Sequence, residues 1–222
     1  MKRISTGFEN LDKLMGGGLP PGYNFVLSGK IDTDKTVLTY LLINNHIKSG
    51  GKCLYIVTNR DTDSIKEELE ELNLDYNKIS KNLFFLDCFS AKAGNKKGTN
   101  IEDLNSVSAK LEAMRTQIGK ENLIEVFDTV SDFFINNESK KVIKFLEAAC
   151  ARALKSKSIA LFLLDQGAQE ERDLIALESV TQGTVELENK EDMNRLRVSK
   201  LVGLQHDNRW VNYKIEANKI LF

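Results

Sequence analysis

Histidine, cysteine and proline are scarce in this chain, and their scarcity excludes several kinds of site. The 222 residues include 2 His, 3 Cys and 2 Pro. Cys53, Cys88 and Cys150 lie far apart in apolar segments and form no Cys-x-x-Cys pair, so we expect buried, reduced thiols. His46 and His206 lack any matching acid–histidine spacing, which argues against a zinc site and places them on the surface or on a helix face.

The chain also lacks an excess of charge of either sign and any long apolar run. Its 31 Lys and Arg residues balance 32 Asp and Glu residues, and this net charge of −1 gives no general affinity for nucleic acid or for an anionic membrane. No apolar segment approaches the roughly 18 residues that cross a bilayer. Met1-Lys2-Arg3 leads into polar residues and not into a secretory signal core. We therefore expect a cytoplasmic protein with neither a membrane nor a nucleic-acid partner.

What is present is an alternation of apolar strands and amphipathic helices, which predicts an α/β fold. Five strand–helix alternations are followed by a strand-rich tail of alternating polarity. We expect a single domain over residues 1–222, with a mostly parallel central sheet flanked by helices and a C-terminal antiparallel extension. The predicted strands are 23–28, 53–58, 83–88, 123–128, 159–164, 184–188, 195–201 and 211–216. The predicted helices are 4–15 with Thr6 as its cap, 35–48, one capped by the polar run 59–64, 101–118, 139–154 and 174–179, and 90–100 is predicted to be a mobile loop.

The segment after the first predicted strand nearly matches a phosphate-binding loop. Gly29, a four-residue spacer and Lys35-Thr36 fit the pattern G-x-x-x-x-G-K-[ST], in which backbone N–H groups surround phosphate oxygens. Asp34 replaces the second glycine of the pattern, and Asp32 adds another carboxylate. Two unit charges roughly 5 Å apart at an effective dielectric constant near 20 repel by about 3 kcal/mol, which is about a hundredfold in affinity for a nucleotide.

This altered loop has two interpretations. In the first it binds no phosphate, because Asp32, Thr33 or Asp34 caps the following helix and complements its dipole, an effect of about 0.3–1 kcal/mol. Lys35 then pairs with Asp32 or Asp34. In the second interpretation, Lys35 and Thr36 still hold Mg-ATP, which is the only cofactor that the sequence suggests. We favour the loop without phosphate.

The order of motifs along the chain resembles that of the KaiC-like branch of the RecA-type ATPases, a branch common in archaea. The segments that carry the resemblance are residues 5–12 (STGFENLD), residues 16–22 (GGGLPPG), the altered phosphate loop and residues 53–57 (CLYIV). The resemblance covers essentially the whole chain. It implies a RecA-like P-loop NTPase fold in a single-domain protein.

Carried over to this chain, the family's site residues are incomplete. Lys35 and Thr36 match the phosphate-binding lysine and the hydroxyl that holds Mg²⁺. Asp128, at the end of a predicted strand, matches the acid that supports the metal through water, although it is equally well interpreted as a loop acid. Asn59 and Arg60 occupy the positions of two glutamates, one of which activates the attacking water in the family, and neither residue can act as a general base.

The family's trans-acting element, K-x-R-G, reaches the nucleotide of a neighbouring subunit and corresponds here to Lys200-Leu201-Val202-Gly203, without the arginine. A general base contributes about 10²–10⁴-fold and an arginine finger about 10³–10⁵-fold to such reactions. The sequence therefore predicts a protein that keeps the scaffold without hydrolysing ATP, and that acts through contacts with a protein partner or with itself as a homo-oligomer. Two alternatives stay open: an ATP-binding protein with slow turnover, and a recombinase-paralogue role on DNA.

Overall fold

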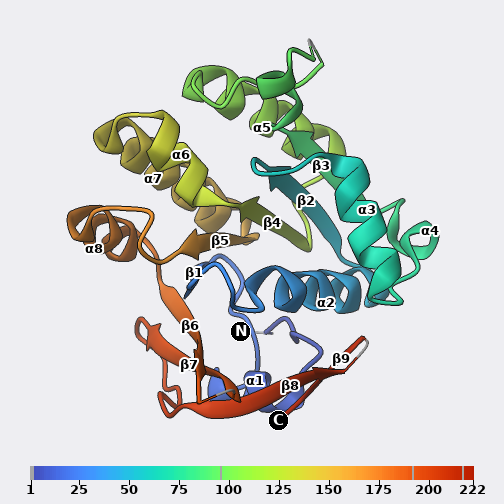
Figure 1. Cartoon of the computed structure of the whole chain (residues 1–222), viewed down its shortest axis with the longest axis vertical. Helices are drawn as coiled ribbons and strands as arrows, with labels where there is room; N and C mark the ends of the chain where they lie inside the picture. Colours follow the sequence, from blue (N-terminus) through green and yellow to red (C-terminus); the bar gives the residue numbers. More distant parts are fainter. Residues whose placement is uncertain (1–2, 96, 192, 217) are drawn as a thin grey trace.

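The computed structural model describes residues 3–95, 97–191, 193–216 and 218–222, and these residues build one sheet with the strand order β3-β2-β4-β5-β1-β6-β7-β8-β9 (Figure 1). Neighbouring strands from β3 to β6 are parallel, and β6 to β9 are antiparallel. The predicted fold class, a mostly parallel sheet with a C-terminal antiparallel extension, is confirmed. The strands are β1 (Asn24–Gly29), β2 (Lys52–Val57), β3 (Leu83–Asp87), β4 (Leu123–Asp128), β5 (Ile159–Asp165), β6 (Gly183–Lys190), β7 (Met193–Leu201), β8 (Val211–Glu216) and β9 (Lys219–Leu221).

Helices cover both faces of the parallel part of the sheet (Figure 1). Every residue of β1 and of β4 is buried, as is typical of parallel strands between two helical layers. One apolar core joins the sheet to α1 (Glu9–Leu14), α2 (Lys35–Lys48), α3 (Thr62–Glu71) and α4 (Tyr76–Ile79). The other joins it to α5 (Leu104–Ile118), α6 (Val130–Asn136), α7 (Ser139–Ser156) and α8 (Glu171–Val180). Within the described ranges, no helix combines the length and the apolar character needed to cross a membrane.

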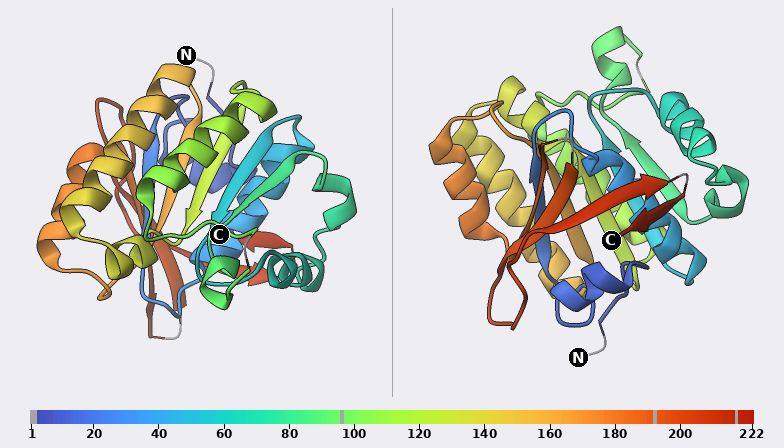
Figure 2. Two further views of the ribbon diagram at one scale, coloured as in Figure 1. Left: turned by 90° about the horizontal axis from the view of Figure 1, so that it is seen from above. Right: turned by 60° about the horizontal axis from the view of Figure 1, so that its bottom comes forward.

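The antiparallel strands bring the C-terminal part of the chain back over α1 and α2. β6 pairs in parallel with β1 and antiparallel with β7, so the sheet changes direction at β6. In Figure 1 these strands turn away at the bottom of the molecule, and Figure 2 (right) shows them crossing the face that carries α1 and α2. Their buried side chains belong to the same core as those of α1 and α2. This return places β7 and β8 close to the loop that joins β1 to α2.

Several element boundaries differ from the sequence prediction. α4, α6 and β9 were not predicted, and α4 spans only 4 residues, too few to show a helical period. The first helix begins at Glu9 and not at residue 4, because Gly7 has a φ of 83°, and Thr6 is not its N-cap. The predicted loop 90–100 contains a 3₁₀ helix, η1 (Ser90–Ala93), and position 96 lies outside the described residues. The helices predicted at 101–118 and 174–179 are α5 and α8, with the bounds given above.

The three thiols are buried and free, as predicted, and one of the two histidines is buried as well. Burial raises the pKa of Cys88 and of Cys150 to about 12. His206 is partly exposed, whereas His46 lies on a helix face, that of α2, and is only 2% exposed. Its Nε2 lies 3.0 Å from the carbonyl oxygen of Asn122, in the connection between α5 and β4. The His46 ring therefore belongs to the core face of α2.

The buried His46 predicts a loss of stability in mild acid. Burial lowers the pKa of His46, so below about pH 6.5 the unfolded chain binds more protons than the folded chain. The free energy of unfolding should therefore fall as the pH decreases from about 6.5 towards the folded-state pKa. Urea unfolding at several pH values measures this slope. His46→Gln should flatten it and His206→Gln should leave it unchanged, whereas equal slopes in all three proteins would contradict this role for His46.

Candidate functional site

The altered phosphate loop lies at the carboxyl end of the parallel strands, where open α/β sheets carry their ligand sites. It joins β1 to α2, and Gly29 at the end of β1 lies beside Asp165 at the end of β5. Asp128 ends the next strand, β4, and is in register with the last residue of β2, after which Asn59 and Arg60 follow. The topology thus brings the predicted residues of the loop, of β4 and of β2 to one edge, and adds Asp165 to them.

The Lys35 ammonium is held by oxygen atoms of the protein itself. Its side chain is 4% exposed, and Nζ lies 3.1 Å from Oδ1 of Asp165. Nζ also donates to the carbonyl oxygens of Gly29 at 3.1 Å and of Lys30 at 2.5 Å. An ammonium group has three N–H donors, so these contacts use all of them. The partner predicted for this lysine, a carboxylate of its own loop, is wrong, because the neighbouring strand β5 supplies the acid.

Asp34 does not cap α2, although it stands at the N-cap position. Its side chain makes no capping hydrogen bond, and Oδ2 instead accepts one from Nδ2 of Asn194 in β7 at 2.7 Å. Burial raises the pKa of Asp34, and the nearby Tyr213 hydroxyl of β8 opposes that shift. We call Asp34, Asn194 and Tyr213 the Asp34 cluster. Thr33 does not cap the helix either, since its hydroxyl donates to the Lys30 carbonyl at 2.8 Å.

Gly29 and Thr36 are the other two predicted residues of this segment, and Gly29 has tight surroundings. A Cβ atom at Gly29 would collide with the Thr33 hydroxyl and with the carbonyl oxygen of Leu187 in β6, so this position requires glycine. Thr36 lies in the first turn of α2 and is partly buried. The antiparallel part of the sheet therefore closes over the loop from the side of β6 and β7.

Arg60 and Asp128 form the centre of a second set of contacts. Asp128 is 2% exposed, and its Oδ2 accepts a hydrogen bond from the Tyr55 hydroxyl at 2.7 Å and lies 3.3 Å from Nη2 of Arg60. Nη1 of Arg60 lies 2.8 Å from Oε2 of Glu68, to which the Tyr40 hydroxyl also donates at 2.7 Å. We call these five residues the Arg60 network. Burial raises the pKa of Asp128, while Arg60 and the Tyr55 hydrogen bond oppose that shift.

A third cation with its own carboxylate partner extends the edge towards β3. Nζ of Lys92, in η1, donates to the Thr58 carbonyl at 3.0 Å and lies 3.2 Å from Oδ2 of Asp132 in α6. Lys35, Arg60 and Lys92 thus each have a carboxylate partner. Of these carboxylates, only Asp128 was predicted as a site residue from the sequence, and the position of Asp165 at the end of an apolar strand was the one available signal.

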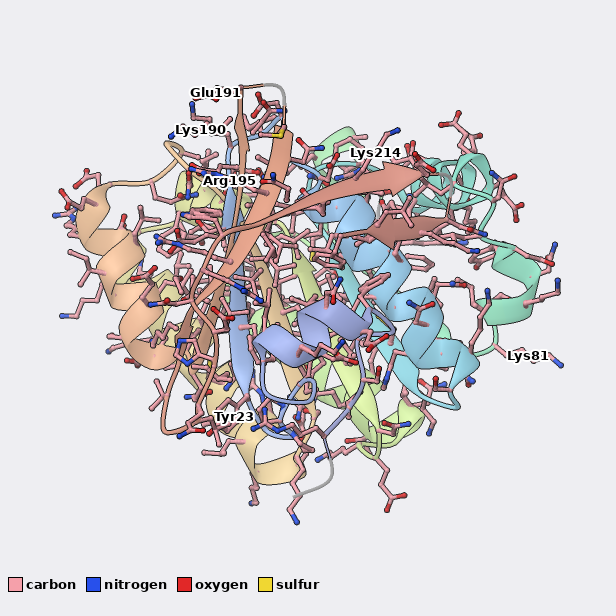
Figure 3. All side chains as sticks on the ribbon, turned by 90° about the horizontal axis from the view of Figure 1, so that it is seen from below. Tyr23, Lys81, Lys190, Glu191, Arg195 and Lys214 are labelled. Atoms are coloured by element: carbon pink, nitrogen blue, oxygen red, sulfur yellow. The ribbon has the colours of Figure 1, made fainter. Side chains whose placement is uncertain are left out.

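Lys200 and Gly203 lie at the opposite end of the sheet from the loop. β7 runs antiparallel to β6, so the end of β7 lies beside the start of β1, where the Tyr23 hydroxyl donates to the Val202 carbonyl at 3.0 Å. Figure 3 shows Tyr23 at one end of these strands and the β6–β7 turn, residues 190–191, at the other. The Lys200 ammonium donates to the carbonyl oxygen of Glu178, in the last turn of α8, and to that of Thr181, just after the helix, at 2.7 Å. Within one chain, the predicted trans-acting element does not meet the altered loop.

Comparisons with known proteins agree with this fold. The family model described as "ATPase: KaiC" matches residues 4–222. The archaeal flagellar ATP-binding protein FlaH of Methanocaldococcus jannaschii is 27% identical over 163 residues, covering 72% of this chain and 66% of FlaH. The circadian clock protein KaiC2 of Synechocystis is 26% identical over 218 residues, covering 94% of this chain and 37% of KaiC2. The chain thus spans less than two thirds of the length of these two relatives.

A solved structure of a KaiC-like protein from Pyrococcus horikoshii has the same fold. It matches this chain with a TM-score of 0.82 at 17% identity, and the match covers 99% of this chain and 98% of the other. At this identity the similarity concerns the fold alone.

Proposed function

Because the chain belongs to the KaiC-like family of RecA-type ATPases, we propose that it is a member that keeps the scaffold, does not hydrolyse ATP, and acts through protein contacts in regulation or assembly. The observation that carries the proposal is the state of Lys35, whose ammonium is buried among protein oxygens, with the Asp165 carboxylate 3.1 Å away. A phosphate group would have to displace Asp165 and then lie next to Asp34. Both steps cost binding free energy, because each brings anionic groups together.

The position of the family's catalytic glutamates supports the same proposal. Asn59 and Arg60 stand there, and a guanidinium stays protonated at physiological pH and cannot accept a proton from water. Glu68 of α3 is a carboxylate in contact with Arg60, but it already accepts hydrogen bonds from Arg60 and from Tyr40. No step of ATP hydrolysis is therefore assigned to these residues.

Protein contacts are proposed because large apolar side chains are exposed at both ends of the sheet. Ile31, in the altered loop, is 83% exposed, and Val202, in the predicted trans-acting element, is 51% exposed. Subunits that meet head to tail would bring these two ends together and cover both side chains. The partner is accordingly a second copy of this chain or another protein of the same fold.

Three measurements on the unmodified protein test the proposal. We expect Mg-ATP to bind in calorimetric titration with a dissociation constant no tighter than about 1 mM, given the repulsion of about 3 kcal/mol from Asp34. Steady-state phosphate release should not exceed that of Lys35→Ala. Light scattering should give a mass above the 25.0 kDa of one chain. Hydrolysis that Lys35→Ala abolishes would defeat the proposal, and a mass of one chain at all concentrations would defeat its self-association.

The second candidate is an ATP-binding protein with slow turnover. Two observations favour it. Lys35 and Thr36 are still the first residues of α2, at the edge of the sheet where Asp128 is the last residue of β4. In addition, FlaH is described as an ATP-binding protein. Micromolar binding of Mg-ATP without hydrolysis in the same titration would support this candidate over the first.

A further inference from the structure

Asp128 is the acid that would support a magnesium ion in this family, and its surroundings test whether the ion fits. Mg²⁺ requires close, nearly octahedral coordination by oxygen atoms, several of them from water. Oδ2 of Asp128 already accepts from the Tyr55 hydroxyl at 2.7 Å and lies 3.3 Å from Nη2 of Arg60. Across the described ranges, no group of three or more His, Cys, Asp or Glu side chains could hold a metal ion. A guanidinium at hydrogen-bond distance from the same oxygen repels a divalent cation, so these residues do not fit Mg²⁺.

The Arg60 guanidinium is anchored on more than one side. Nη1 lies 2.8 Å from Oε2 and 3.1 Å from Oε1 of Glu68, and Nε donates to Oδ1 of Asn59 at 3.0 Å. Tyr40 in turn holds Glu68 through its hydroxyl. A planar guanidinium with several fixed donors can hold two carboxylates in one geometry. Arg60 thus joins α3 to the end of β4 through Nη1 and Nη2, while Nε is held by the neighbouring Asn59.

The Asp128 carboxylate needs a cation because it is almost completely buried. It is 2% exposed, and a buried carboxylate is tolerated when it is paired and hydrogen-bonded. Lys35 is not available for this purpose, since it faces Asp165, and Lys92 faces Asp132. Arg60 is the cation within salt-bridge distance of Asp128 among the residues that the structure describes.

We infer that Arg60 takes the place of the divalent metal ion at Asp128, so that a guanidinium of the protein itself pairs with this carboxylate and this edge of the sheet does not depend on Mg²⁺. The inference rests on the proposed function, because that function is what identifies Asp128 with the family's metal-supporting acid. It concerns the folded protein without nucleotide.

Thermal unfolding in EDTA and in millimolar MgCl₂ tests the inference. The midpoint of the unmodified protein should be the same in both solutions. Arg60→Met roughly keeps the side-chain volume and removes the charge, so in EDTA it should lower the midpoint by roughly 5–15 °C, because it leaves the Asp128 carboxylate buried without a cation and with the Tyr55 hydrogen bond alone. MgCl₂ should then raise the midpoint of Arg60→Met by roughly 2–5 °C through binding at the freed carboxylate.

Two further variants assign the magnesium effect to Asp128. Arg60→Met combined with Asp128→Asn should lose the response to MgCl₂, because no carboxylate remains at that position. Lys92→Met removes the neighbouring ion pair of similar length, 3.2 Å against 3.3 Å, and leaves Arg60 on Asp128. It should show no response to MgCl₂. An Arg60→Met protein that folds without responding to MgCl₂ would overturn the inference.

Manganese binding to the unmodified protein provides a test that does not depend on the folding of any Arg60 variant. Electron paramagnetic resonance of Mn²⁺ should show only free ion in the presence of the protein. Bound Mn²⁺ that Asp128→Asn removes would overturn the inference. Both experiments omit nucleotide, so their results are independent of ATP hydrolysis. The inference about Arg60 can be overturned although the unmodified protein does not hydrolyse ATP. Conversely, the protein can be found to hydrolyse ATP although Arg60 still excludes the metal.

Discussion

Replacing Asp34 with glycine should strengthen the binding of Mg-ATP by up to about a hundredfold. The variant removes a carboxylate next to the expected phosphates, and the repulsion of about 3 kcal/mol corresponds to that factor. It also restores the glycine that lets the backbone approach a phosphate. The hydrogen bond from Asn194 is lost at the same time, which frees the loop from β7. Calorimetric titration of both proteins with Mg-ATP measures the difference.

Two matched variants separate the charge of Asp34 from its hydrogen bonds. Asp34→Asn removes the charge and keeps an oxygen that can accept from Asn194, so it should recover most of the gain. Asn194→Ala breaks the contact of 2.7 Å and keeps the charge, so it should give no gain. If neither Asp34→Gly nor Asp34→Asn improves the affinity for Mg-ATP, then the Lys35–Asp165 pair, and not repulsion between Asp34 and the phosphates, is what weakens nucleotide binding.

Adding Asn59→Glu and Arg60→Glu to the Asp34→Gly protein should raise steady-state ATP hydrolysis by about 10²–10⁴-fold, the contribution of a general base. A carboxylate after β2 could accept a proton from the attacking water, and Asp128 would lose its guanidinium partner. The Asp34→Gly protein without these changes should bind nucleotide and still release no phosphate, because binding and proton transfer depend on different residues. Phosphate release under saturating Mg-ATP measures both proteins.

The control for this experiment keeps the size of the side chains without supplying a base. Asn59→Gln and Arg60→Gln in the Asp34→Gly protein should leave phosphate release at its background level. Lys35→Ala in the glutamate variant should abolish any hydrolysis gained. Because Arg60→Glu places a third carboxylate near Asp128 and Glu68, the glutamate variant should be less stable than the glutamine variant in the absence of Mg²⁺. Equal rates in the two variants would show that no base had been created.

The sequence by itself was sufficient for the fold class and for the position of the candidate site along the chain. β4 is a mostly apolar run in which every residue is buried, and α7 has apolar residues at helical spacing. Both patterns involve only residues that are close together in the sequence. The loop between β1 and α2 was found for the same reason, because Gly29, Lys35 and Thr36 lie within a short segment. These features are local, and local patterns can be read without knowing what the chain folds against.

The tertiary structure decided which charges meet at the site. Lys35 pairs with Asp165 because β1 lies beside β5, and Asp34 bonds to Asn194 because the antiparallel strands return over α2. From the sequence, Lys35 and Asp34 were expected to interact within their own loop and helix, because the order of strands in a sheet cannot be read from the spacing of residues within one segment. Ion pairs depend on distance in space, and a buried ion is stable only with a partner at hydrogen-bond range. The packing of strands far apart in the chain therefore determined the chemistry of this edge.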